Sequence, residues 1–268
     1  MKESWGRVWA IALRHMFLLR RSVLRSSDVV LWPLLELSVG GFMVVYLEEA
    51  LPGTQKDQVS ALLAGLILWD LYFRAQQGLM FSFMEEIWTY HTVNLLITPI
   101  RLWEWFVGAA LYNLQRVALA ALVLAGLAFW FFGFRLWDLG WQFFPLLLNL
   151  LLFAWFLGLA TSAFTMLFGF AAEPLIMVAP FVLMPVSAVF YPVSVLPGWL
   201  QPIALSIPTG VVFEDMRAVL MGDAFIAWKD LPKLLLMNAV YGAIAVAFFT
   251  YMFHRARISG RLCRLGQD

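Results

Sequence analysis

Apolar residues dominate the chain in long runs that are separated by short polar segments. A helix needs about 20 apolar residues to cross a hydrocarbon core of about 30 Å. The runs of about this length or longer are expected to form six transmembrane helices, at residues 29–48, 59–81, 104–132, 142–170, 174–193 and 233–254. The segments between them, such as EEALPGTQKD, carry charges or turn residues. The pattern predicts an all-α polytopic membrane protein with a single transmembrane domain over residues 1–268.

Residues 1–27 precede the first apolar run and have the pattern of an amphipathic helix. One helical face carries apolar side chains, namely Trp5, Trp9, Ala12, Met16, Leu19 and Val23. The nearly opposite face carries Arg7, Arg14, Arg21 and Arg25. These two faces are typical of a helix that lies on a membrane surface. Two interpretations stay open: the helix contacts a cytoplasmic partner, or it is a passive anchor.

Residues 84–98 are too polar to cross the membrane but keep a helical pattern. The sequence FMEEIWTYHTVNLLITP places Met84, Trp88, His91 and Leu95 on one face, and Thr98-Pro99 is expected to end the helix. An apolar face on a cytoplasmic helix indicates a docking surface, with Glu85 and Glu86 beside it. A helix that lies on the bilayer would give the same pattern.

Residues 189–210, VFYPVSVLPGWLQPIALSIPTG, contain four prolines in a mostly apolar segment. Proline removes a backbone donor and clashes with the preceding helical turn, so this segment cannot form one continuous helix. It is also more apolar than most exposed loops. An extracellular loop of ordinary kind nevertheless remains one interpretation.

Composition and charge fit a protein whose main solvent is lipid. Hydrophobic residues make up 63% of the chain and charged residues 13%, and the net charge is +1. Such a small net charge does not favour nucleic acid as a partner. The single cysteine, Cys263, excludes an internal disulfide.

The distribution of Lys and Arg predicts that both termini are cytoplasmic. With six spans and a cytoplasmic N-terminus, the inner side has Lys2, Arg7, Arg14, Arg20, Arg21, Arg25, Arg101, Arg255, Arg257, Arg261 and Arg264. The outer side has Lys56, Arg135, Arg217, Lys229 and Lys233. This excess follows the positive-inside rule, so residues 255–268 are expected to form a cytoplasmic tail.

Four charged residues fall inside the expected spans, where charge is costly: Glu36, Asp70, Arg74 and Arg116. Asp70 and Arg116 are expected near the midplane, with Glu36 and Arg74 nearer the inner side. These matched depths predict pairs between helices, although Asp70 and Arg74 are also i, i+4 neighbours that can pair locally. The pairs either brace the helices or, with Gln76, Gln77 and Gln115, line a polar path.

No motif in the sequence supplies enzymatic chemistry. None of the lysines follows a glycine, so the chain has no G-K-[ST] phosphate loop. The histidines, His15, His91 and His254, are far apart and form no metal-binding pattern. The pair Glu85-Glu86 is only weak support for a membrane metalloprotease, because the sequence has no intramembrane histidines after it that could bind a metal. A channel or secondary transporter remains the alternative, although no clear inverted repeat relates the two halves.

The order of these elements resembles the ABC type-2 transport permeases, the membrane subunits of type V ABC exporters. The segments EEIWTYHTVNLLITPI and YPVSVLPGWLQPIALSIPT, the latter followed by VVFEDMRAVL, carry the resemblance best. It implies that residues 84–98 form a coupling helix that docks an ATPase through Glu85, Glu86, Trp88, His91 and Leu95. It also implies that residues 194–220 form an extracellular re-entrant hairpin with limbs at 196–205 and 209–220. The gate residues of this hairpin would be Pro197, Trp199, Pro202, Pro208 and Glu214.

The resemblance further implies a permease subunit of an ATP-driven exporter in a cell membrane, here the inner membrane of a bacterium. Two ABC ATPase subunits would bind ATP and Mg²⁺, because this chain is expected to hold no cofactor or metal. A second copy, or a paralogue, would complete the pathway. The cargo would be amphiphilic or hydrophobic: a lipid, glycolipid, drug or polysaccharide.

Overall fold

The computed structural model describes residues 2–21, 23–50, 56–88, 101–168, 173–223 and 225–259. Within these ranges every regular element is a helix, which confirms the all-α prediction. The longer helices are α1 (Lys2–Arg21), α2 (Val23–Ala50), α3 (Lys56–Trp88), α5 (Leu102–Phe132), α6 (Phe143–Phe168), α7 (Glu173–Val186), α9 (Pro208–Leu220) and α11 (Leu231–Ile258). The short ones are η1 (Leu136–Gln142), η3 (Val193–Val195), α8 (Gln201–Ser206) and α10 (Ile226–Lys229).

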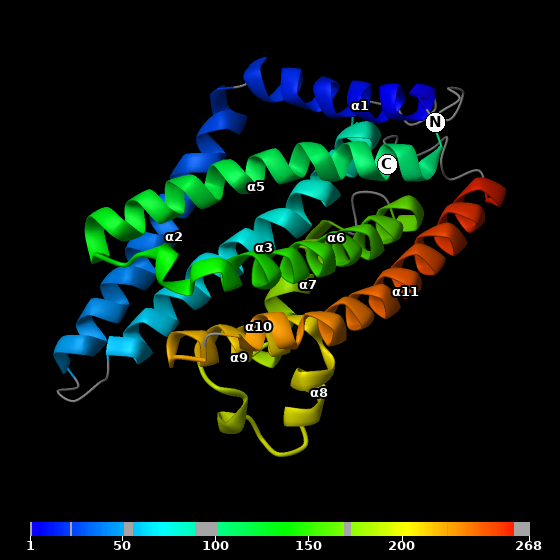
Figure 1. The fold of residues 1–268 in the computed structure, drawn as a ribbon. Helices are drawn as coiled ribbons and strands as arrows, with labels where there is room; N and C mark the ends of the chain where they lie inside the picture. Colours follow the sequence, from blue (N-terminus) through cyan, green and yellow to red (C-terminus); the bar gives the residue numbers. More distant parts are fainter. Residues whose placement is uncertain are drawn as a thin grey trace.

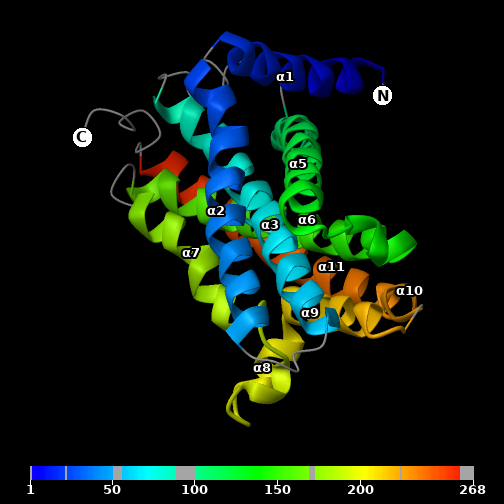
Figure 2. The same ribbon diagram turned by 90° about the vertical axis from the view of Figure 1, so that its left-hand side faces the viewer.

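The long helices form a bundle with smaller helices at its two ends (Figures 1 and 2). Helix α1 lies across one end, near the last turn of α3 and the first turn of α5, and α11 also ends at this end of the bundle. Helices α8, α9 and α10 lie at the opposite end, together with the end of α2 and the start of α3. Both described ends of the chain therefore lie at the end of the bundle that carries α1.

Helices α3 and α6 form the centre of the bundle. Helix α6 packs against α3 and against α11, and α3 also packs against α5 and α2. Most α3 side chains between Ala61 and Met84 are buried. Glycine permits two of these close approaches, because a Cβ at Gly158 would lie 2.9 Å from the Gln76 carbonyl oxygen and one at Gly242 would lie 2.6 Å from Phe156.

Polar side chains connect the helices inside the bundle. Asn113 of α5 donates to the Arg74 carbonyl oxygen (3.4 Å) and accepts a hydrogen bond from Trp155 Nε1 of α6 (3.2 Å). On the far side of α6, Asn238 of α11 donates to the Asn149 side chain (3.0 Å). Hydrogen bonds of this kind hold helices together in lipid, where apolar contact alone does not distinguish neighbouring helices from lipid.

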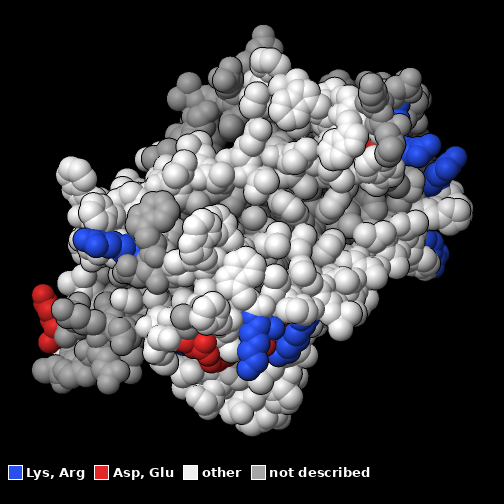
Figure 3. All heavy atoms as spheres, viewed as in Figure 1, with Lys and Arg blue, Asp and Glu red and all other residues white. Residues whose placement is uncertain are grey.

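Three helical stretches in the described residues combine the length and apolar character needed to cross a membrane: Trp103–Phe132, Leu139–Thr165 and Leu231–Ile258. Pro33–Leu47 and Met177–Val186 are shorter apolar helices. Charged side chains lie near the ends of the molecule in Figure 3, with a wide uncharged surface between them. This arrangement fits a protein that is surrounded by lipid at its middle.

Several predicted boundaries are wrong. The expected span at 174–193 is helical only to Val186, because Pro180 and Pro185 weaken the helix and the next residues form other hydrogen bonds. With 14 residues, α7 is about 21 Å long, too short to cross the hydrocarbon core by itself. The expected coupling helix at 84–98 does not begin at 84, since residues 84–88 are the last turns of α3. The expected N-terminal helix at 1–27 ends at Arg21, and residues 23–27 already belong to α2.

Candidate functional site

A groove of about 390 Å³ lies between α2 and α7, with α3 as its floor. These two helices are neighbours in Figure 2. The groove is lined by Leu35, Glu36 and Val39 of α2, Leu66 and Trp69 of α3, Phe181 and Met184 of α7, and Phe190. Its volume is within the range of sites that hold small molecules. Its lining is apolar and aromatic except for Glu36, which is half-buried.

Asp70 and Arg74 form a local ion pair on α3, next in sequence to the groove residue Trp69. Arg74 Nε donates to Asp70 Oδ2 (2.6 Å), and Arg74 Nη2 donates to Asp70 Oδ1 (3.1 Å). Asp70 is 1% exposed. The sequence left open a local pair and pairs between helices for Asp70. The structure has the local i, i+4 pair with Arg74, and these two side chains together carry no net charge.

The other residues predicted for a polar path do not gather at the groove. Gln115 is exposed and Arg116 half-buried on α5, whereas the groove is lined from α2, α3, α7 and Phe190. Gln76 donates to Thr161 of α6 (3.2 Å), so it connects α3 to α6. Gln77 Nε2 lies 4.0 Å from Met177 Sδ of α7. Glu36 is the predicted path residue that lines the groove directly.

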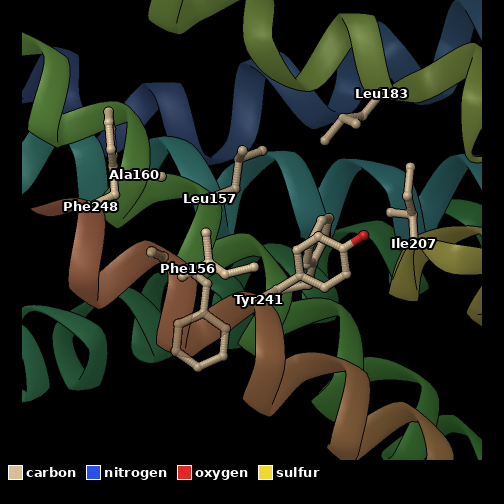
Figure 4. Close-up of a pocket in the computed structure, with 10 residues that line it drawn as sticks. Phe156, Leu157, Ala160, Leu183, Ile207, Tyr241 and Phe248 are labelled. Atoms are coloured by element: carbon tan, nitrogen blue, oxygen red, sulfur yellow. The ribbon is translucent and has the colours of Figure 1, made fainter.

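A second pocket, of about 300 Å³, lies between α6, α7 and α11 (Figure 4). Tyr241 and Ile207 lie at one end of it, and Phe248 and Ala160 lie at the other. Its described lining contains no charged side chain. The Tyr241 hydroxyl donates to the Ser206 carbonyl oxygen (3.2 Å), which connects this pocket to the end of α8.

The proline-rich segment forms two short helices with a break between them, as the hairpin prediction requires. Pro202 lies in the first turn of α8 and Pro208 in the first turn of α9, where a missing N–H costs little. The first limb is shorter than predicted, because α8 begins at Gln201 and the exposed Pro197 and Trp199 precede it. Gly210 permits the tight junction, since a Cβ there would lie 2.1 Å from the Ala204 carbonyl oxygen.

Arg217 of α9 connects this hairpin to the end of α7. Its guanidinium is buried and donates to the carbonyl oxygens of Ala188 (2.6 Å) and Val189 (3.2 Å), directly after α7. Ala188 has a φ of 51°, a left-handed conformation that is uncommon for alanine. These carbonyl groups are satisfied by Arg217, which explains how the chain can leave the helix here while buried.

Two further contacts strengthen the connection between α7 and α9. The Glu214 carboxylate accepts hydrogen bonds from the Val193 backbone and from Arg217. The hydroxyl groups of Ser187 and Thr209 are 2.6 Å apart and both side chains are buried. The predicted gate residue Glu214 is thus a structural partner of the segment that follows α7.

Asp215 is the second buried charge of α9. Burial raises the pKa of its carboxyl to about 7, and the negative charge of Asp230 adds to this rise while Lys233 opposes it. The side chain is 4% exposed. Asp215 therefore titrates near neutral pH at the junction between α9 and the start of α11.

Helix α1 packs on α5 with a face that overlaps the predicted apolar stripe only at Ala12. Val8, Ile11, Ala12 and His15 are buried, whereas the predicted apolar stripe has exposed Trp5 and Trp9 at its start. A Cβ at Gly108 of α5 would lie 2.8 Å from Ile11, so Gly108 permits this close packing. One flank of α1 thus faces the protein, and the adjacent Trp flank is free to face lipid.

One ion pair and one longer polar contact connect α1 to the helices that follow and precede residues 89–100. Arg7 forms a two-pronged pair with the buried Glu104 of α5, with Nε–Oε2 and Nη2–Oε1 distances of 2.9 and 2.8 Å. His15 stacks on Tyr112 and has its Nδ1 3.8 Å from Glu85 Oε2 of α3. Helix α1 therefore touches the last part of α3 and the first turn of α5 at once.

The predicted docking residues are only partly described. Glu85 is half-buried beside His15, and Glu86 and Trp88 belong to the last turn of α3. His91 and Leu95 lie outside the described residues. Their assignment to a docking surface stays a prediction.

The sequence reasoning missed Glu104, Asp215 and Arg217. It searched for charge inside expected spans, and these residues lie at a span boundary or in the proline-rich segment. The i, i+3 spacing of Glu214 and Arg217 in an apolar segment is the sequence signal that indicates their ion pair in the hairpin. In the described residues, no group of three or more His, Cys, Asp or Glu side chains could hold a metal ion.

Comparison with known protein families finds a match that covers most of the chain. A family model described as ABC-2 type transporter matches residues 8–221, which run from within α1 to the end of α9 and include the groove and the hairpin. Among curated proteins, no match to the chain was found.

Proposed function

Because the chain belongs to the ABC-2 type transporter family, we propose that it is one half of the membrane pathway of an ATP-driven exporter. The family match identifies a multi-pass membrane permease component, and the match covers no ATPase domain. ATP and Mg²⁺ would therefore bind a separate ABC ATPase, present in two copies. The cargo would be amphiphilic or hydrophobic, since the groove walls are apolar and aromatic.

The proposed topology has six membrane helices, α2, α3, α5, α6, α7 and α11. Helix α7 is too short to cross alone, and the segment from Ser187 to Val195 would complete the outer part of the crossing with its backbone satisfied by α9. The end with α1 would be cytoplasmic, because α11 ends there with Arg255 and Arg257. The hairpin of α8 and α9 would then lie at the outer side and act as a gate.

The substrate path would follow the α2–α7 groove. On α2 and α7, three of the residues that line this groove have exposed apolar side chains: Leu35 and Val39 on α2 and Phe181 on α7. Apolar side chains that are exposed on two neighbouring helices form a surface that another protein can cover. A second copy, or a paralogue, would cover it and close the two grooves into one pathway.

ATPase docking would act on the inner ends of α3 and α5. Helix α1 is bound to α5 by the Arg7–Glu104 ion pair and contacts α3 where His15 lies beside Glu85, so a force on this end would move α1, α3 and α5 together. Closure of the ATPase pair on ATP would then shift the permease between inward-open and outward-open states. A nucleotide can bias such states only if it binds one of them more tightly.

The family match over residues 8–221 carries this proposal, and copurification tests it. The tagged chain would be coexpressed with an ABC ATPase from the same gene neighbourhood and purified in mild detergent. We expect the ATPase to copurify, and Trp88→Ala to reduce its recovery while the permease stays folded. A chain that purifies without the ATPase and conducts its cargo in ATP-free liposomes would identify a channel or secondary transporter instead.

A further inference from the structure

We propose that Asp215 of α9 and Asp230, the residue before α11, form a proton-binding carboxyl pair. The pair holds the hairpin against α11 when the outer solution is acidic and releases it when that solution is alkaline. As a control on the gate, this inference rests on the proposed function. The pair itself depends only on the contact between α9 and α11, so the two can be tested separately.

The burial of Asp215 gives the first argument. Asp215 is 4% exposed, and its Oδ2 atom has no hydrogen-bond partner in the described part of the structure. A buried carboxylate oxygen without a donor is costly, whereas a protonated carboxyl is neutral and has a donor of its own. The surroundings of Asp215 therefore favour a bound proton.

Asp230 supplies the acceptor for that proton, at the point where α9 contacts the start of α11 (Figure 1). Asp230 precedes the first turn of α11, yet its side chain does not cap the helix, as an aspartate in this position commonly does. The two carboxyl groups are instead close enough to share a hydrogen bond when Asp215 is protonated. The N-terminal end of a helix favours negative charge, so Asp230 is the member of the pair that stays ionised.

Few other charges act on the pair. Lys233 of α11 is exposed and opposes protonation of Asp215, whereas Glu214 of α9 favours it and is itself paired with Arg217. Lys229 of α10 is exposed. The other elements packed on α9, which are α3, α6, α8 and η1, add no charged side chain to this set within the described residues. The pKa of Asp215 is therefore raised to about 7, where a proton can be gained or lost.

The place of Asp215 on α9 indicates what loss of the proton would do. Arg217 holds one side of α9 to the carbonyl groups that follow α7. Asp215 comes two residues earlier, so it lies on roughly the opposite side of the helix. Two ionised carboxylates at short distance repel each other, so deprotonation weakens the contact with α11 and leaves the contact with α7 intact. The hairpin would then move away from α11 together with the end of α7.

Two pairs of spin labels would measure this movement in the full chain. One pair is attached through Met221→Cys, directly after α9, and Leu236→Cys of α11. The other pair uses Met221→Cys and Val182→Cys of α7, and all three of these side chains are exposed. Both carry Cys263→Ser, and dilution with unlabelled protein restricts the measured distances to one chain. Pulsed electron paramagnetic resonance in nanodiscs at about pH 5 and about pH 9 samples both protonation states of Asp215.

We expect a narrow distribution of α9–α11 distances at the lower pH and a longer or broader one at the higher pH, with the α9–α7 distance unchanged. Asp215→Asn should remove this pH response, because the amide stays neutral and can still donate to Asp230. Asp230→Asn should also remove it, since the repelling charge is lost, and it serves if Asp215→Asn does not fold. The control is Asp223→Asn, which changes an exposed acid after α9 and should keep the full response.

Three results would overturn the inference. The first is an α9–α11 distance that is the same at both pH values. The second is a pH response that survives in both Asp215→Asn and Asp230→Asn. The third is an α9–α7 distance that changes as much as the α9–α11 distance.

The outcomes also separate this inference from the proposed function. If the ATPase copurifies but the labels show no pH response, only the control of the hairpin by a proton is wrong. If the labels respond as expected but no ATPase associates, the exporter assignment is wrong and the proton-binding pair remains.

Discussion

Arg217 is the residue that holds the hairpin to the end of α7, and its loss should be measurable as stability. Arg217→Met removes the donors to the Ala188 and Val189 carbonyl oxygens, which are 2.6 and 3.2 Å away. Buried acceptors left without a partner cost about 1–3 kcal/mol, so the free energy of unfolding should fall by about that amount. Thermal unfolding of the purified protein in detergent would measure it.

The matched variant is Arg217→Lys, which keeps the charge but cannot reach both carbonyl oxygens with a planar fork. It should recover part of the lost stability. An Arg217→Met protein that unfolds like the unaltered chain would show that the hydrogen bonds at the end of α7 are not formed in solution.

Asp215 should make the stability of the protein depend on pH. Burial raises the pKa of its carboxyl in the folded protein from 3.8 to about 7. Between these values the unfolded chain has released a proton that the folded protein still holds, so stability falls as pH rises from about 4 to about 7. Asp215→Asn should remove this contribution to the pH dependence. Melting temperatures measured across this range would test it, with the exposed Asp223→Asn as the control.

Single residues were the hardest scale to predict from sequence. Glu36, Asp70 and Arg74 were recognised because charge stands out inside an apolar run. Their partners were not determined, since the local and interhelical pairs of Asp70 depend on rotamers that the sequence does not specify. Arg217 and Glu104 were not recognised as buried ion-pair residues, because their burial depends on how α9 and α1 pack on other helices.

At the scale of elements, the junction between α8 and α9 should not tolerate a larger residue. A Cβ at Gly210 would lie 2.1 Å from the Ala204 backbone oxygen, so Gly210→Ala must shift one helix of the hairpin. Overpacking of this kind costs about 1–3 kcal/mol. Gly198→Ala in the same hairpin meets nothing within 4 Å and is the control, expected to change stability by less than about 0.5 kcal/mol. Equal melting temperatures for the two variants would contradict the observed hairpin geometry.

The pair between Arg7 and Glu104 should determine whether α1 stays attached to α5. Arg7→Glu places two acids together, and Glu104→Arg places two bases together, so each single variant should release α1 and reduce copurification of the ATPase. The double variant restores opposite charges and should recover part of this association. Protease sensitivity of α1 would report its release directly. Double and single variants that behave alike would show that the pair does not hold α1.

Helices were predicted well where the run of apolar residues is long. They were predicted poorly where packing against other helices determines the end of the helix or its buried face. Long apolar runs identified α5, α6 and α11 to within a few residues. The expected span at 174–193, which corresponds to α7, was predicted too long. Apolar residues continue past Val186, but the helix ends there and the carbonyl groups of Ala188 and Val189 accept hydrogen bonds from Arg217. The apolar stripe of α1 was predicted from periodicity alone, and the face that packs on α5 is rotated from it towards Val8 and His15.

At the scale of the whole molecule, the order of elements was sufficient to recognise the family, since the match covers residues 8–221. The groove could not be predicted, because it is formed by α2, α3 and α7, which are separated in sequence and meet only in the fold. For the same reason, the sequence placed Gln115 and Arg116 with Glu36, although α5 lies away from the groove lining.

The central claim is that two copies meet across the α2–α7 face and that ATP changes their arrangement. One nitroxide label on Val39→Cys, in a variant with Cys263→Ser, would give one spin pair per complex. Pulsed electron paramagnetic resonance would measure the distance between the two labels in nanodiscs that also contain the ATPase. We expect a defined distance that changes when ATP binds to an ATPase that cannot hydrolyse it. No defined distance between labels, or the same distribution with and without ATP, would contradict the account.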